Sequence, residues 1–342
     1  MNKENLLILT LSALALTACS SGSDASDSPK EEQPVEIRLS SGLEVQTRAY
    51  TPTQSTAVAD GQTFYAWADD HVNKASATDH TSDVIDYLKG WTLASSGASL
   101  TGSKQYYSAA GNNLDVYAIH GTFNNAVTEG TTTWAAFSTG LTHTVSATQN
   151  TGTGYLDSDL LYAVALNLAR QSTPHTLTFK HLLSKIEVYF IVGNGVSVSD
   201  ITGATVTIQS VLPTAEVTLS KAAATSSVVT ASGTPVDISP KVTTSTSETL
   251  TIGTETKQVP VFAEAIIVPQ KYDTNRDGTG TGMRLIKIKL PNGISLETPI
   301  GTYEFAPGKR YAYNLTVNVK DIRLQGEITD WTGDPAIPID AY

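Results

Sequence analysis

Short runs in which apolar and polar residues alternate are the feature that most constrains how this chain folds. In the clearest run every second residue is apolar over nine positions, at Tyr311, Tyr313, Leu315, Val317 and Val319. This period of two is typical of a half-buried β-strand, because successive side chains of a strand point to opposite faces of the sheet. We therefore expect a sheet-forming strand in this region.

The apolar phase then slips by one residue at positions 320–321. It continues through Ile322, Leu324 and Ile328. A slip of one residue would turn the buried face outward unless a bulge or turn intervenes, so we expect the chain to bend or to change sheet there.

Comparable runs recur along the whole sequence. They lie at residues 63–67, 114–119, 177–179, 186–191, 204–208, 215–219 and 285–290. Gly, Asn and Asp separate them, and only residues 83–88 and 160–165 suggest short helical turns. This pattern predicts an all-β fold built from sandwiches.

The first 18 residues have the features of an export leader. Lys3 precedes an apolar stretch at residues 6–16, which is too short to span a bilayer, and Thr17 and Ala18 lead to the only cysteine, Cys19. A cysteine at this position is typical of a lipoprotein. We therefore predict that Cys19 carries a lipid and is neither a disulfide partner nor a nucleophile.

A second segment between this leader and the main body also alternates. Residues 20–34 are polar and acidic and are expected to form a solvated tether. Residues 35–47 then place apolar side chains at Val35, Ile37, Leu39, Leu43 and Val45. We interpret them as two half-buried strands joined by a turn at residues 40–42, which together form a plug that is cut away at the bond between Arg48 and Ala49.

The length of the chain after such a cut suggests two domains. The remainder, 342 minus 48 or 294 residues, is long for one ordinary β-sandwich. A polar stretch punctuated by proline at residues 170–174 is the expected boundary, which gives regions 49–174 and 175–342.

The composition argues against several functions. The formal net charge is −11 and no basic run is present, so binding to nucleic acid is disfavoured. Six histidines and one cysteine offer little for a metal or thiol enzyme, and no nucleophile elbow, phosphate loop or dinucleotide fingerprint occurs. We expect no catalytic residues and no cofactor.

The candidate metal ligands each have a simpler interpretation. Residues 273–278 resemble a calcium loop, but Arg284 stands where the loop would need a carboxylate, so we predict a hairpin connection. His175 and His181 would lie about 20 Å apart on a strand. His71 and His80 have no cysteine or paired acidic neighbour at ligand spacing. The sequence therefore predicts no metal site.

Several segments together resemble the Bacteroidales fimbrillin family, the subunits of type V pili. The resemblance covers essentially the full length of the chain. It rests on Cys19 in its lipobox, the Arg48–Ala49 junction, and residues 158–163, 179–188, 307–317 and 328–331.

The resemblance implies a fold, a maturation route and a role. It implies two transthyretin-like β-sandwich domains, export as an outer-membrane lipoprotein, and removal of the N-terminal segment by an Arg-specific protease. The mature subunit would begin at Ala49 and form a surface fimbria. The protease and identical or related fimbrial subunits are then the expected partners, and a host surface ligand is left open.

The alternating segments suggest how such subunits could join. Loss of the plug would expose an apolar trough between unpaired strand edges, and the C-terminal region of another subunit, residues 311–342, could fill it. Both alternating C-terminal runs are donor candidates, whereas Pro335 and Pro338 make the tail a poor central strand. The alternatives are a fimbrial tip or anchor subunit, or a surface glycan-binding lipoprotein.

Overall fold

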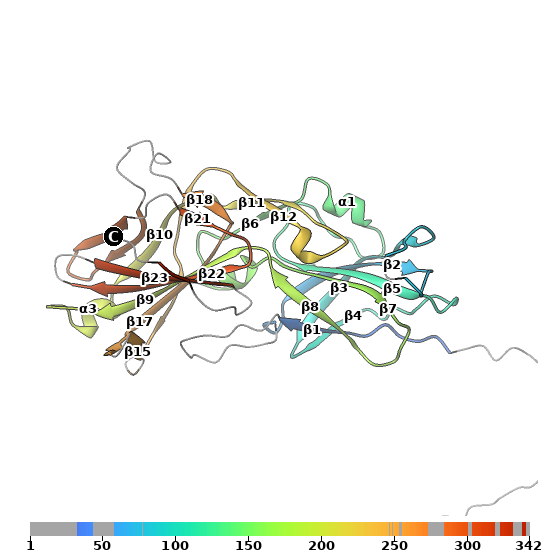
Figure 1. Cartoon of the computed structure of the whole chain (residues 1–342), viewed down its shortest axis with the longest axis horizontal. Helices are drawn as coiled ribbons and strands as arrows, with labels where there is room; N and C mark the ends of the chain where they lie inside the picture. Colours follow the sequence, from blue (N-terminus) through green and yellow to red (C-terminus); the bar gives the residue numbers. More distant parts are fainter. Residues whose placement is uncertain are drawn as a thin grey trace, which may run out of the picture. The chain divides into compact units, whose positions relative to one another are not determined.

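Strands dominate the protein, which confirms the predicted all-β fold (Figure 1). The computed structural model describes residues 33–43, 58–76, 78–245, 247, 249–252, 255–272, 284–299, 303–318, 322–330 and 337–339. The helices are short: α1 (Trp134–Ser138), α2 (Gly154–Asp157), α3 (Val198–Thr202) and the 3-10 turn η1 (Ala224–Ser226). Residues 34–342 form one compact unit, and the division at 174–175 stays a prediction.

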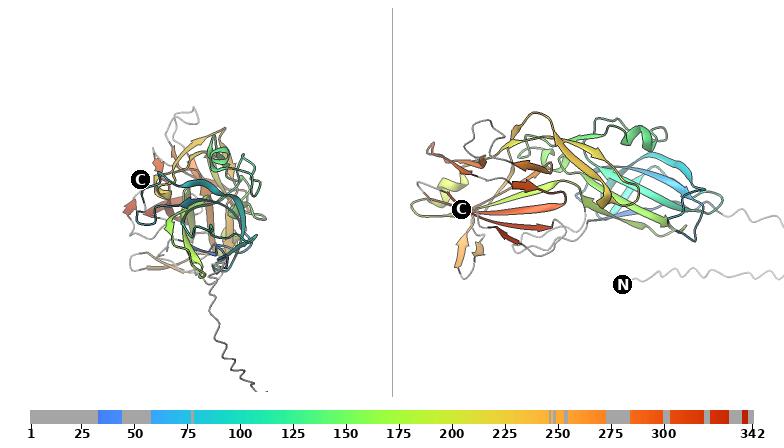
Figure 2. Two further views of the ribbon diagram at one scale, coloured as in Figure 1. Left: turned by 90° about the vertical axis from the view of Figure 1, so that its right-hand side faces the viewer. Right: turned by 45° about the horizontal axis from the view of Figure 1, so that its top comes forward.

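The first half of the chain forms a closed barrel of seven strands. In spatial order these are β1 (Leu39–Leu43), β4 (Ser99–Gly102), β3 (Val84–Ser96), β2 (Thr63–His71), β5 (Asn113–His120), β7 (Leu161–Leu168) and β8 (His175–His181). The barrel strands run from blue to green in the drawings (Figure 1, Figure 2). Strand β8 follows the expected boundary, yet it pairs within the barrel with β1 and β7.

The second half is built around a sheet of six strands. Their order is β14 (Lys241–Thr244), β17 (Val261–Ile267), β9 (Ser184–Val192), β22 (Lys309–Val317), β23 (Ile322–Asp330) and β24 (Ile337–Ile339). A sheet of four strands has the order β13 (Val236–Ile238), β10 (Thr205–Val211), β19 (Arg284–Lys289) and β20 (Ser295–Pro299).

Smaller sheets complete the fold. One has the order β12 (Val228–Ser232), β11 (Thr214–Thr218) and β6 (Thr142–Thr144), and two pairs are β15 (Thr249–Ile252) with β16 (Glu255–Gln258), and β18 (Gln270–Tyr272) with β21 (Tyr303–Phe305). Strand β6 precedes β7 in sequence, yet it pairs with β11 outside the barrel. The first half therefore contributes a strand to the second.

The seven alternating runs predicted between residues 63 and 290 each lie in a strand, to within one residue, but both helical predictions are wrong. Residues 83–88 enter β3 and residues 160–165 enter β7. Val84 and Ile85 are β-branched and favour strands, and β7 has an apolar run typical of a strand that is covered on both faces. Pairing with β2 and β5 supplies long-range hydrogen bonds that a short helix would lack.

The phase slip at residues 320–321 marks a change of direction, as predicted. Strands β22 and β23 pair antiparallel within one sheet, with Leu315 opposite Leu324 and Val317 opposite Ile322. The hairpin connection predicted at residues 273–278 stays a prediction, and the strands before and after it, β18 and β19, lie in different sheets. That segment itself lies outside the described residues.

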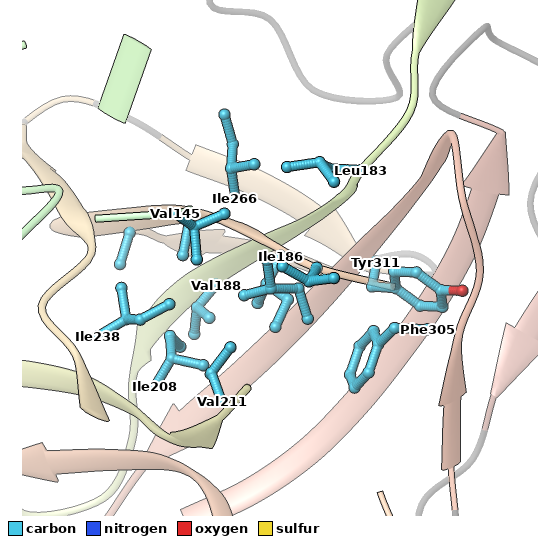
Figure 3. Close-up of a cluster of buried hydrophobic side chains, with 14 of the residues drawn as sticks. Val145, Leu183, Ile186, Val188, Ile208, Val211, Ile238, Ile266, Phe305 and Tyr311 are labelled. Atoms are coloured by element: carbon cyan, nitrogen blue, oxygen red, sulfur yellow. The ribbon is translucent and has the colours of Figure 1, made fainter. Parts of the chain in front are cut away.

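Strand β9 is the central strand of the second half. Ile186, Val188 and Phe190 point into the main core, where Figure 3 shows Ile186 and Val188 near Tyr311, Phe305 and Val211. The alternate residues face the other side of the sheet, so both faces of β9 are buried. A strand covered on both sides needs polar partners for any charge that it carries.

Charged side chains lie on the face of β9 that points away from the main core, and there they form a network of ion pairs. Lys185 Nζ lies 2.9 Å from Glu187 Oε1 and 2.8 Å from Glu264 Oε2. Lys241 Nζ lies 2.7 Å from Glu264 Oε1, and Arg310 NH1 lies 3.3 Å from Glu187 Oε2. The network links strands β9, β14, β17 and β22, so it stabilises the order of the sheet.

The network makes stability depend on acid in a predictable way. Burial alone would raise the pKa of Glu264, but the ammonium groups of Lys185 and Lys241 outweigh it and lower that pKa from 4.5 to about 2. The ionised group therefore stabilises the fold above pH 4.5, and this contribution is lost as the pH falls through about 2. We expect the free energy of unfolding to lose about 3 kcal/mol from this group between pH 5 and pH 2.

Urea unfolding at the two pH values checks this expectation. Glu264→Gln should remove that part of the pH dependence, whereas Glu216→Gln, at an exposed position on β11, should keep it. An identical pH dependence in wild type and Glu264→Gln would show that this ionisation contributes nothing to stability.

Candidate functional site

Strand β1 is the seam that closes the barrel. It pairs antiparallel with β4 through Leu39 and Ser40, and it pairs parallel with β8 over five positions, from Leu39 opposite His175 to Leu43 opposite Phe179. Figure 1 shows β1 beside β8 and near β4. Removal of β1 would therefore leave β4 and β8 each with an unpaired edge.

The segment before β1 extends this pairing. Ile37 N donates to Gln105 O at 2.8 Å, and Arg38 O accepts from His175 N at 2.9 Å. The Arg38 side chain is 56% exposed and reaches Glu36 at 3.1 Å. An ion pair this exposed contributes little, so the backbone and the apolar side chains hold the segment in place.

The apolar side chains of this segment enter the barrel core. Ile37 and Leu39 are each 3% exposed, and Val35 and Leu43 pack against the same cluster with partial exposure. Large members of the cluster include Phe64, Trp91, Leu93, Leu100, Leu177 and Phe179. Ile37 and Leu39 are thus integral to the core, although their segment lies close to the N-terminal end of the compact unit.

The predicted turn at residues 40–42 is wrong. Strand β1 runs straight through Ser40, Ser41 and Gly42, and Gly42 pairs with Thr178. Glycine weakens a strand but does not stop it when partners on both sides supply the hydrogen bonds. The segment is one continuous strand at this point, not two joined by a turn.

The C-terminal donor candidates lie in two different settings. Tyr311, Tyr313, Leu315 and Val317 belong to β22, are at most 5% exposed, and lie between β9 and β23 in the sheet. Ile322, Leu324 and Ile328 belong to β23. Strand β22 would have to break pairings on both sides before it could leave, whereas β24 is an edge strand that pairs only through three positions of β23.

Some predicted site residues lie outside the described residues. These are Cys19, Val45, Arg48, Ala49 and Val319. Their roles in lipid attachment, cleavage and strand donation stay predictions.

Sequence reasoning missed one group of polar residues in the barrel. His71 and His80 do have acidic partners, because the fold places Asp83 and Asp115 beside both imidazoles. The only local signal was the spacing of three between His80 and Asp83, because Asp115 lies on a different strand.

Among the residues that the structure describes, no helix is long and apolar enough to cross a membrane.

The described part of the chain is nearly all β, and strand β1 closes the barrel as its seam. A profile of fimbrillin-like proteins matches residues 47–331. The chain therefore belongs to the fimbrillin-like family, a family of fimbrial proteins and not of enzymes. Membership implies a location at the cell surface and association with other fimbrial subunits.

Solved structures support the fold. A candidate cell adhesion protein from Bacteroides uniformis has a TM-score of 0.54 and 17% identity, over 86% of this chain and 98% of that one. A candidate cell adhesion protein from Bacteroides ovatus has a TM-score of 0.57 and 16% identity, over 87% of this chain and 98% of that one. No curated protein matches the chain by sequence.

Proposed function

We propose that this protein is a structural fimbrial subunit that polymerises by strand exchange after its N-terminal segment is removed, and that it supports adhesion. The observation that carries the proposal is β1. It closes the barrel, it and the segment before it bury Leu39 and Ile37, and it is joined to the rest of the chain through a segment that contains Arg48. A cut after Arg48 would break the covalent link between β1 and the rest of the barrel, so that only noncovalent contacts hold β1 in place.

The energy that holds β1 suits displacement. Ile37 and Leu39, both buried, contribute on the order of 3 to 6 kcal/mol, and the partly buried Val35 and Leu43 add a smaller amount. An incoming strand that fully buried an apolar side chain at each of four or five positions would contribute on the order of 6 to 15 kcal/mol before entropic costs. The incoming strand would then be favoured by the positions that Val35 and Leu43 fill only in part, provided that β1 is free to leave.

The C-terminal region of a neighbouring subunit is the proposed donor. Its edge strand β24 is held by three pairings and is therefore easily released. Pro338 within it cannot donate a ladder hydrogen bond, so in the groove this strand would leave one position toward β4 or β8 unpaired. Donor and groove are different surfaces, so the contact is head-to-tail and propagates into a fibre. Strand β23 is the next candidate if β24 alone is too short.

The proposed maturation route begins at the outer membrane. Lipid on Cys19 would hold the precursor at the surface with its groove filled, and an Arg-specific protease would then cut after Arg48 and release it. Lipidation would be temporary. A subunit that keeps Cys19 in the assembled state would instead be an anchor or a glycan-binding lipoprotein.

Mass spectrometry and electron microscopy test the proposal together. The chain from Ser20 onward, treated with an Arg-specific protease, should acquire Ala49 as its N-terminus and form fibres. A Lys-specific protease is the matched control, because a cut after Lys30 leaves β1 in place. Protein that lacks residues 20–48 and stays monomeric would contradict the proposal, and acylated Cys19 on intact cells would favour the anchor or binder.

A further inference from the structure

Four titratable side chains converge at one end of the barrel, apart from the β1 seam. His71 is the last residue of β2, His80 and Asp83 lie in the connection from β2 to β3, and Asp115 lies on β5. Each offers one ligand atom, and the four atoms all lie within 4.8 Å of one another. The connection is thus tied to two barrel strands through a single cluster.

The spacing of these atoms fits a tetrahedral ion. His71 Nδ1 lies 3.2 Å from Asp83 Oδ2 and 3.4 Å from Asp115 Oδ2. His80 Nδ1 lies 2.9 Å from Asp83 Oδ2 and 3.0 Å from Asp115 Oδ2. Ligands about 2.0 Å from a tetrahedral zinc ion stand about 3.3 Å from one another, so these four spacings are close to those of a zinc site, and the remaining two pairs of atoms lie within 4.8 Å.

The outer atoms of the cluster are already held by the backbone. His71 Nε2 donates to Ser76 O at 2.7 Å, which leaves the lone pair of Nδ1 free in the neutral ring. Asp83 Oδ1 accepts from Val72 N at 3.3 Å. These bonds fix one face of each side chain and direct the other toward the cluster.

Asp115 provides an independent sign of a missing partner. The residue is fully buried, and its Oδ1 accepts from Asn167 N at 2.6 Å. Its Oδ2 makes no well-aligned hydrogen bond among the described residues, although the Nδ1 atoms of His80 and His71 lie 3.0 and 3.4 Å from it. A buried carboxylate oxygen that lacks an aligned donor is costly, and a cation at the cluster would remove that cost.

We infer that His71, His80, Asp83 and Asp115 bind a zinc ion. Two imidazole nitrogens and two carboxylate oxygens suit zinc, whereas calcium and magnesium require about six or more oxygen ligands. All four positions come from protein, so the site is structural and leaves no position for a substrate. The ion would fix the connection from β2 to β3 against β5, and the His80 side chain, 41% exposed, gives it a path from solvent.

The alternative is a metal-free cluster in which protonated histidines pair with the two carboxylates. Zinc titration of the metal-stripped chain from Ser20 onward separates the two. This chain lacks the single thiol of Cys19, and it contains the whole compact unit 34–342. We expect one zinc per chain by mass spectrometry of metals, a higher melting temperature with zinc, and no such effect from excess magnesium.

Variants locate the site. Asp115→Asn should weaken zinc binding by at least about 100-fold, since even outer residues of such sites cost 10- to 100-fold. His80→Ala should do the same and is safer for folding, because its side chain is partly exposed. Asp159→Asn is the matched control: Asp159 pairs with His181 at 3.0 Å but stands outside the four-residue cluster. Absence of bound zinc in wild type, or equal binding in wild type and both ligand variants, would overturn the inference.

Discussion

Arg48→Ala is expected to leave the protein as a lipid-anchored monomer that forms no fibres. The protease would find no arginine at the junction, so β1 would stay covalently attached and keep its place between β4 and β8. An attached strand competes with any incoming strand at a high effective concentration, and the groove would remain filled. Electron microscopy of cells and detection of lipid on Cys19 check both parts of the expectation.

Arg38→Ala is the matched control for this variant. Arg38 lies in the same segment, but its backbone carbonyl accepts a hydrogen bond from His175, and its neighbours Ile37 and Leu39 are buried. A protease needs an extended and unpaired backbone, so this arginine is protected in the folded precursor. Arg38→Ala should therefore be cut and assemble as wild type does. Fibres of normal length from Arg48→Ala would show that the removal of β1 is not required.

The strands were predictable because their signal is local. Alternation at residues 309–317 or 184–192 reflects the faces of a single strand, and it survives whatever the strand pairs with. The two helical predictions failed because a short apolar run carries no such periodicity. In β3 and β7 the pairing across the barrel decided the conformation, and that information lies far away in the sequence.

The candidate sites also divide into those with a local sequence signal and those that depend on contacts between distant strands. Ile37 and Leu39 could be recognised as core residues from their spacing of two. The cluster around Asp115 could not, because Asp115 and Asp83 are 32 positions apart and meet only when β5 lies alongside β2. The pairing of β6 with β11 could not be predicted for the same reason. Contacts between distant strands are a property of topology, and one sequence shows topology poorly.

Deletion of residues 332–342 is expected to abolish polymerisation while the monomer stays folded. The deletion removes β24, which among the described strands pairs only with β23, and keeps the full pairing of β22 with β23. Circular dichroism and melting temperature should therefore change little, whereas cut protein should show no fibres by electron microscopy. Fibres of normal length from the deleted chain would place the donor elsewhere, with β23 as the next strand to test.

A mixture of the two variants separates donor from acceptor. Arg48→Ala keeps a complete C-terminal region but a filled groove, so it can donate and cannot accept. The deleted chain, once cut, has an open groove and no donor, so it can accept and cannot donate. Head-to-tail growth needs both surfaces on every subunit, and the mixture should therefore stop at a complex of two chains.

Size-exclusion chromatography with light scattering measures this stop directly. We expect each variant alone to run as a monomer and the equimolar mixture to contain a species whose mass is the sum of the two chains. Wild-type chain, cut under the same conditions, should grow into long polymers. Two persistently separate monomers would contradict exchange between the C-terminal region and the β1 groove, and long polymers from the mixture would contradict the assignment of one donor and one groove to each subunit.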